Sequence, residues 1–272
     1  MPLKAWDVNI SRGVLTGCNE AFVISTEKRN EILACCKTSD ELRQTEELIR
    51  PILRGRDIKR YSCEWKDLWL INVHNGIKGI LKAVNIEDYP AVKKWLDDGG
   101  VAYNGKRYKG FSQLSKRSDQ GDTPYNLRSC AYLDDFNLPK IIWAELSRTG
   151  NSFVLDDDKY FVGNTGYILT SEELDRSRLQ YLLGILNSRI TLYQIDRLTT
   201  RFDDNGWRWL RQFVELLRVP PFLDFERITS TVVTTNSSNQ KEKSELLNSI
   251  IYEIYKFSPS EIEYINNSLA TY

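Results

Sequence analysis

The stretch RGRDIKRYSCEWKDLWLI, from Arg54 to Ile71, joins a basic segment to an apolar one and organises the rest of the chain. Residues 54–60 hold four cations and one acid, and an aromatic and apolar run follows at residues 68–71. This pattern predicts a basic loop that leads into a buried strand, an arrangement from which a rigid scaffold presents cations to a polyanion. A solvated turn before an ordinary strand is the alternative interpretation. The four cations are Arg54, Arg56, Lys59 and Arg60.

The charge balance of the whole chain gives no support for nucleic-acid binding. The 272 residues include 37 basic and 37 acidic side chains, and 41% are hydrophobic, which is typical of a soluble globular protein with a sizeable core. Residues 219–272 hold four of the basic and seven of the acidic side chains, so the preceding part carries a net charge of +3. Any basic surface must therefore be a local patch on residues 1–218.

The sequence argues against a membrane or secreted protein and against a zinc site. It has no apolar run of 18 residues, and its first residues are too polar for a secretory signal. The five cysteines have no CxxC spacing, and there is a single histidine, His74. We therefore expect reduced thiols, a cytoplasmic location and no bound metal.

A second basic segment extends from Gly99 to Ser118 and contains no acidic residue. Aromatic side chains alternate with its cations, which suits a loop that enters a nucleic-acid groove. A mobile surface loop is the alternative. The cations are Lys106, Arg107, Lys109, Lys116 and Arg117, and the aromatic residues are Tyr103, Tyr108 and Phe111.

The pattern of apolar residues predicts an α+β fold, with a mixed or antiparallel sheet, packed helices and a small helical C-terminal tail. Strands are expected at 21–24, at 68–73 and in several runs between 139 and 170, where β-branched and aromatic residues dominate. One long helix is expected from Leu174 to Leu198, and a turn at Asn205–Gly206. We expect one large domain over 1–218, a polar linker over 219–240 and a helical tail over 241–272.

Few catalytic motifs are present. There is no GxSxG, no P-loop and no GxGxxG, and one histidine leaves little room for a catalytic triad. Asp57, Glu64 and Lys66 have the spacing of the metal-binding acids and lysine of many nucleases. An ordinary ion pair between Glu64 and Lys66 is the simpler interpretation, but a metal-dependent nuclease remains one alternative. A protein-interaction module that docks through its C-terminal helices is another.

Several segments together resemble the TaqI-like C-terminal specificity domain, which is the target-recognition part of Eco57I-type restriction-modification enzymes and adenine-specific DNA methyltransferases. The layout is also similar to that of type I specificity subunits. The matching segments occur in the family's order over nearly the whole chain. They are RGVLTGCNEAFVI, IRPILRGRDIKRY, LPKIIWAEL, YLLGILNSRITLYQI, RVPPF and LLNSIIYEIYKFSPSEIEYI.

The resemblance implies a DNA-binding chain without catalytic residues of its own. In that family, the methyltransferase domain lies upstream in the same polypeptide and binds S-adenosylmethionine, and a fused nuclease would add a divalent metal such as Mg²⁺. The family's adenine-gripping tetrapeptide begins with Asn, Asp or Ser, whereas VPPF here begins with Val219 and cannot accept the hydrogen bond from adenine. The implied partners are double-stranded DNA and the upstream methyltransferase domain.

The candidate DNA-binding residues fall into two classes. Lysines and arginines would contact phosphates, and arginine, asparagine or glutamine side chains would read base edges. By the family's GRDIxRY-like segment, the first class includes Arg54, Arg56, Lys59 and Arg60, to which the second basic segment adds Lys106, Lys109, Lys116 and Arg117. The readout candidates are Asn104, Arg107, Gln113, Arg148, Arg201 and Arg208.

Overall fold

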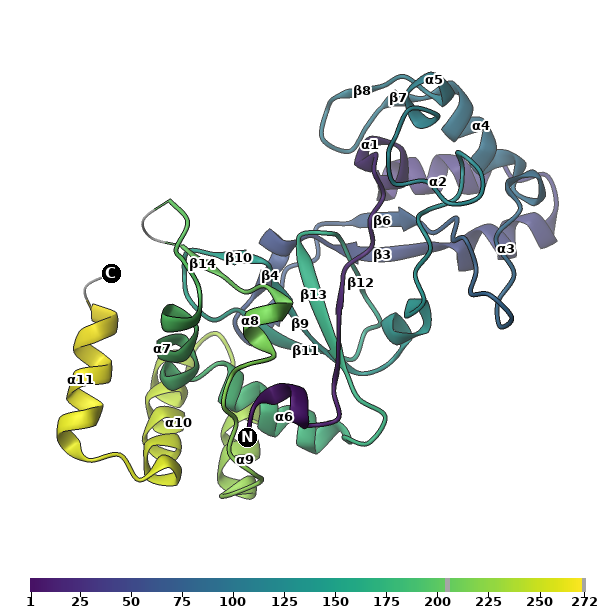
Figure 1. Ribbon diagram of the computed structural model, residues 1–272. Helices are drawn as coiled ribbons and strands as arrows, with labels where there is room; N and C mark the ends of the chain where they lie inside the picture. Colours follow the sequence, from purple (N-terminus) through teal and green to yellow (C-terminus); the bar gives the residue numbers. More distant parts are fainter. Residues whose placement is uncertain (204–205, 271–272) are drawn as a thin grey trace.

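Buried apolar side chains form two separate clusters, and each surrounds one four-stranded sheet (Figure 1). The first cluster is built mainly from residues 14–136. The second joins the N-terminal residues 3–10 to residues 141–265. The computed structural model describes residues 1–203 and 206–270, so the turn expected at Asn205 lies outside the described residues.

The first sheet has the strand order β12-β3-β6-β2, in which β12 and β3 are parallel and the other pairs are antiparallel. The apolar run of the organising stretch forms its central strand β6, where Leu70 and Ile71 are fully buried. Helices α2 to α5 cover this half of the molecule (Figure 1). The strands are β2 (Val23–Ser25), β3 (Ile49–Leu53), β6 (Leu68–Ile71) and β12 (Phe161–Val162). The helices are α1 (Asn19–Phe22), α2 (Thr26–Ala34), α3 (Ser39–Leu48), α4 (Pro90–Asp98) and α5 (Phe111–Leu114).

The second sheet is antiparallel throughout and has the order β1-β13-β9-β11. Strands β9 and β13 lie at its centre, and all five residues of each are buried. The strands are β1 (Asn9–Arg12), β9 (Lys140–Ala144), β11 (Phe153–Asp156) and β13 (Gly166–Thr170). Its helices are α6 (Arg176–Leu186), α7 (Arg189–Leu198), α8 (Arg211–Val214), α9 (Phe225–Val233), α10 (Gln240–Tyr255) and α11 (Pro259–Ala270).

Short strand pairs and 3₁₀ turns complete the fold. The pairs are β4 (Ile58–Lys59) with β5 (Ser62–Cys63), β7 (Gly100–Val101) with β8 (Arg107–Tyr108), and β10 (Leu146–Ser147) with β14 (Trp207–Arg208). The 3₁₀ turns are η1 (Leu3–Ala5), η2 (Gly55–Asp57), η3 (Ile86–Asp88) and η4 (Leu133–Asn137). The α+β prediction is confirmed by this mixture of helices and sheets.

The prediction of a single helix from Leu174 to Leu198 is wrong, because α6 ends and α7 begins around Asn187. The buried Asn187 amide donates to the Phe153 carbonyl at 2.9 Å and accepts from the Phe153 N–H at 3.2 Å, which pairs it with the end of β11. Ser188 then caps α7 by accepting from the Thr191 N–H. These local hydrogen bonds compete with a continuous helix, as short polar side chains commonly do.

Part of the region predicted to be a linker is helical. Helix α9 lies within residues 219–240, and its Ile228 and Val232 are buried against α6. Helix α10 packs on α9 and contributes Leu247 and Ile251 to the second core cluster. The prediction was misled by the polar residues, which occupy the solvent-facing side of α9. The division into domains stays a prediction.

Among the described residues, no helix combines the length and apolar character needed to cross a membrane.

Candidate nucleic-acid interface

The basic segment at the start of the organising stretch is held in place by Asp57. The Asp57 carboxylate accepts hydrogen bonds from the Arg54 backbone N–H at 2.9 Å, from Arg54 Nε at 2.8 Å and from Arg54 Nη2 at 2.8 Å. Asp57 is 2% exposed, and its hydrogen bond raises the pKa of Arg54 above the ordinary value. Arg54 is therefore fixed and neutralised, whereas Arg56 is exposed and forms no ion pair with the described residues.

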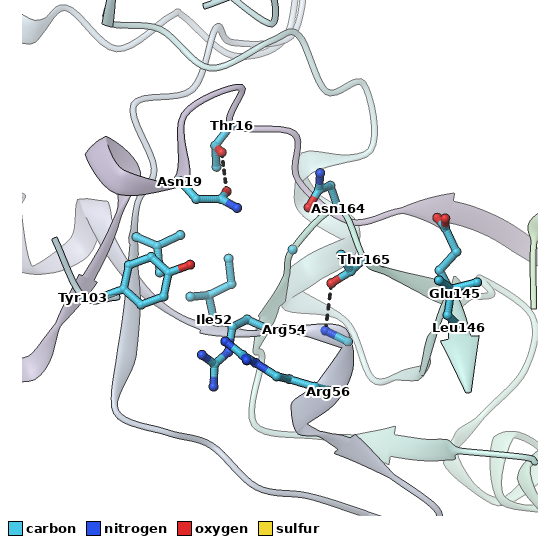
Figure 2. Close-up of a pocket in the computed structure, with 13 residues that line it drawn as sticks. Thr16, Asn19, Ile52, Arg54, Arg56, Tyr103, Glu145, Leu146, Asn164 and Thr165 are labelled. Carbon is cyan, nitrogen blue, oxygen red and sulfur yellow. Dashed lines mark hydrogen bonds between the residues drawn. The ribbon is translucent and has the colours of Figure 1, made fainter. Parts of the chain in front are cut away.

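A cavity of about 400 Å³ opens beside Arg54 and Arg56 (Figure 2). It is bounded by segments far apart in the sequence: the N-terminal turn, the end of β3, the β7–β8 turn and residues 163–165. Its size falls within the range of small-ligand sites in proteins. The side chains that line it include Asn19, Arg54, Arg56, Tyr103, Glu145 and Thr165.

The N-terminal turn borders this cavity because its backbone at Gly13 packs closely against the backbone of residues 163–166. Gly13 donates its N–H to Gly166 O at 2.9 Å, and a Cβ at Gly13 would lie only 2.1 Å from Gly163 O. The chain then reaches Thr16, whose hydroxyl donates to Asn19 Oδ1 at 2.6 Å. A glycine is therefore required at position 13 for Asn19 to reach the cavity wall.

The β7–β8 turn lies against α1 and also borders the cavity. Tyr103 lines the cavity, and burial raises the pKa of its hydroxyl, with a smaller opposing effect of Arg54. The Asn104 side chain accepts a hydrogen bond from the Lys106 N–H within the turn and donates one to Glu20. Lys106 and Arg107 are exposed and have no ion pair in the described part of the chain. Neither cation lines the cavity, but both belong to the β7–β8 segment that carries Tyr103.

The β10–β14 pair continues the wall on the other side. Leu146 lines the cavity and lies directly opposite Arg208 in the strand register. The Arg208 and Arg148 guanidinium groups lie 5.7 and 5.9 Å from the centre of the Phe202 ring, and Arg148 also pairs with Asp203 at 2.8 Å. Both this pair and the β7–β8 pair project on the same side of the molecule (Figure 1).

The prediction that Arg117 contacts phosphate is wrong. Arg117 is 6% exposed, and its guanidinium donates to four backbone carbonyls and lies 4.7 Å from the centre of the Phe22 ring. The carbonyl acceptors belong to Thr16, Asp119, Pro124 and Asn126. Arg117 therefore ties the 115–127 segment to the N-terminal turn.

Other candidates also make internal contacts. Arg60 is half-buried and donates to Asn187 O at the C-terminal end of α6, where a cation is favoured by the helix dipole. Gln113 donates to Cys18 Sγ and accepts from the Lys109 N–H. Arg201 pairs with Asp196 and stacks on Trp207. Lys59, Lys109 and Lys116 are exposed but do not line the cavity.

The structure argues against both alternative functions. Asp57 is buried and fully engaged by Arg54, while Glu64 and Lys66 pair with each other at the surface at 3.1 Å. No group of three acids, histidines or cysteines that could hold a metal ion occurs among the described residues. The apolar faces of α10 and α11 are used inside the second core cluster, which includes Ile250 and Ile265.

Reasoning from the sequence missed Asn19 and Arg12. Arg12 joins Glu145 to the segment at Asn164, with bonds of 2.6 Å to Glu145 Oε2 and 2.9 Å to Asn164 O. Both residues precede the first basic segment by more than 30 positions. Only folding brings Asn19 to the cavity and Arg12 to Glu145 in its lining, so no local pattern could identify them.

The sequence model of the TaqI-like C-terminal specificity domain matches residues 50–214. Two curated relatives align with the chain. The Type II methyltransferase M.BstVI of Geobacillus stearothermophilus is 22% identical over 282 residues, which cover 98% of this chain and 43% of the relative. The Type II methyltransferase M.BanIII of Aneurinibacillus aneurinilyticus is 23% identical over 215 residues, covering 76% and 34%. The chain therefore spans less than half the length of these relatives.

Two solved structures share the fold. The Type IIL restriction-modification enzyme MmeI, solved in complex with DNA, superposes with a TM-score of 0.61 at 12% identity, over 95% of this chain and 33% of that one. The type IIG restriction endonuclease BpuSI superposes with a TM-score of 0.50 at 14% identity, over 93% of this chain and 31% of that one. At these identities the likeness concerns the fold alone.

Proposed function

Because the chain belongs to the family of TaqI-like C-terminal specificity domains, we propose that it recognises a specific sequence in double-stranded DNA for an adenine-specific DNA methyltransferase. The observation that carries the proposal is the set of segments around the cavity described above. Arg54 and Arg56, the β7–β8 turn and the β10–β14 pair come from separate parts of the sequence, yet all border or adjoin one cavity. We call this surface the recognition wall.

The recognition wall suits a duplex better than a small substrate. Its exposed cations Arg56, Lys106 and Arg107 and the partly buried Arg208 come from η2, the β7–β8 pair and β14 rather than from one enclosed pocket. Lysines and arginines on such a surface attract the phosphate backbone, which supplies affinity and register. Arg107, Arg148 and Arg208 at the projecting ends have the side-chain type that reads guanine O6 and N7.

The chemistry itself would belong to another part of the enzyme. The related Type II methyltransferases are more than twice as long as the aligned region, which leaves room for a catalytic domain. That domain would bind S-adenosylmethionine and receive the target base when it swings out of the stack. The present chain would hold and read the surrounding duplex.

Selection from a library of random duplexes tests this proposal. The full chain is mixed with the library at two salt concentrations, and the bound DNA is separated by mobility shift and sequenced. We expect an enriched motif together with a salt-dependent affinity. Salt-dependent binding without any enriched motif would mean simple polyanion affinity and would contradict the proposal.

A further inference from the structure

We infer that the cavity between Asn19, Arg56 and Tyr103 receives one phosphodiester group of the DNA backbone. The inference rests on the proposed function and names the part of the duplex that this cavity holds. It assigns Asn19 and Thr165 as DNA contacts, neither of which belongs to the basic segments.

The orientation of Asn19 makes it a donor toward the cavity. Its Oδ1 accepts the Thr16 hydroxyl at 2.6 Å, and Thr16 is 4% exposed, so this contact is sheltered from water. Its Nδ2 has no partner among the described residues, and Figure 2 shows the amide nitrogen turned toward the open space beside Tyr103. Thr16 therefore acts as a positioning residue that presents an N–H pair to whatever enters.

Thr165, like Asn19, offers a hydrogen-bond donor to the cavity. Its Oγ1 accepts the Gly55 backbone N–H at 2.9 Å, which leaves the hydroxyl hydrogen free to be donated. Residue 165 is exposed and lines the cavity on the side opposite Tyr103 (Figure 2). A second neutral donor thus faces the same space.

The charges around the cavity also favour an anion. Arg56 has no carboxylate partner in the described chain, while Arg54 is already bound by Asp57 through Nε and Nη2. The carboxylate in the lining, Glu145, is paired with Arg12 at 2.6 Å, which offsets its repulsion. Arg56, Asn19, Thr165 and the Tyr103 hydroxyl together offer donors to a group that carries only acceptors.

An adenine edge would fit this arrangement less well than a phosphate, whereas guanine O6 and N7 both accept, so mismatched duplexes are needed to separate a guanine contact from a phosphate contact. Adenine presents an acceptor and a donor in the major groove, and a side chain that reads it must both donate and accept. The Asn19 oxygen already accepts from Thr16, and the other lining side chains named above donate. A phosphodiester oxygen only accepts, so it matches the lining.

The test compares Asn19→Ala and Arg56→Ala with Arg43→Ala, a matched control whose exposed side chain lies on α3 and pairs with Glu47. Affinity of the full chain is measured by fluorescence anisotropy for the selected duplex and for singly mismatched duplexes, each over a range of salt. We expect both cavity variants to weaken binding about tenfold and equally for all these duplexes. Arg56→Ala should also lower the slope of log affinity against log salt by about 1, while Arg43→Ala should change neither quantity.

A second series locates the phosphate. Each duplex carries one neutral methylphosphonate in place of a phosphodiester. At one position this replacement should weaken DNA binding by the wild-type chain but have little further effect on DNA binding by Arg56→Ala. Circular dichroism confirms that each variant is folded.

Two results would overturn the inference: a loss of affinity confined to duplexes with one particular base pair, or no methylphosphonate position at which wild type and variant differ. The first would mean base readout. If the wild-type chain bound DNA without sequence preference, the proposed function would fail, but the methylphosphonate series would still decide the phosphate contact.

Discussion

Replacement of Arg117 by methionine separates a structural role from a DNA contact. The guanidinium donates to the backbone carbonyls of Thr16, Asp119, Pro124 and Asn126, and all of these bonds would be lost. A hydrogen bond from a charged donor contributes about 1.5–3 kcal/mol. Since water can reach some of the freed carbonyls after the change, we expect a total loss of about 3–5 kcal/mol in the free energy of unfolding.

The stacking of Arg117 on Phe22, at 4.7 Å from the ring centre, adds to this loss. Because folded domains are stable by only about 5–15 kcal/mol, the effect should be large in a urea titration followed by circular dichroism. Lys116→Met is the matched control, since Lys116 is the sequence neighbour of Arg117 and its side chain is exposed. We expect this variant to change the free energy of unfolding by no more than about 0.5 kcal/mol. If Arg117→Met kept the wild-type urea midpoint but bound DNA less tightly, the assignment of Arg117 as a structural residue would be refuted.

Three further predictions concern the fold. The side chains of Lys140 and Asp156 are 0% and 1% exposed and pair at 2.5 Å. Lys140→Met should therefore lower the free energy of unfolding by about 3–5 kcal/mol, because it leaves a buried carboxylate unpaired, and adding Asp156→Asn should recover much of this loss. Equal stability of the single and the double variant would contradict this prediction. Burial lowers the pKa of His74 below 6.5, so the unfolded chain takes up this proton at a higher pH than the folded chain, and stability should fall as the pH drops below about 6.5. His74→Gln should remove this part of the pH dependence in urea titrations between about pH 7 and 5. An unchanged pH profile of the variant would argue against this prediction. Deletion of residues 241–272 removes Leu247, Ile250 and Ile251 from the second core cluster and should lower the urea midpoint, whereas an unchanged midpoint would support the separate tail expected from the sequence.

The sequence predicted those parts of the fold that depend on local patterns. The expected strands correspond to β2, β6, β9, β11 and β13, because β-branched and aromatic runs bounded by turn residues identify buried strands. The helical tail was also predicted, and α10 and α11 form there.

The errors arose where long-range contacts decide the outcome. Asn187 ends α6 because it pairs with Phe153, a residue 34 positions away. Strand β3 was not among the expected strands, and it includes Pro51, which has no N–H to donate, because β3 pairs there with β6. Helix α9 forms in a polar segment because Phe225, Ile228 and Val232 pack it on α6.

The candidate site was predicted in outline but not in detail. A count of cations identified Arg56, Lys106 and Arg107, which are exposed along the recognition wall. It could not distinguish them from Arg117, because the burial of Arg117 depends on four carbonyl groups brought together by folding. Asn19 was missed because its neighbours in sequence carry no basic pattern.

Photo-crosslinking tests most directly whether the two projecting strand pairs hold the same duplex. A photoreactive amino acid is placed singly at Lys106, at Arg148 and, as a control, at Arg43, and each chain is irradiated with the duplex selected from the library. We predict crosslinks from positions 106 and 148 to nucleotides within about one helical turn of each other, roughly 10 base pairs, and none from position 43. Crosslinking from only one of the two strand pairs, or equally from position 43, would contradict the recognition wall.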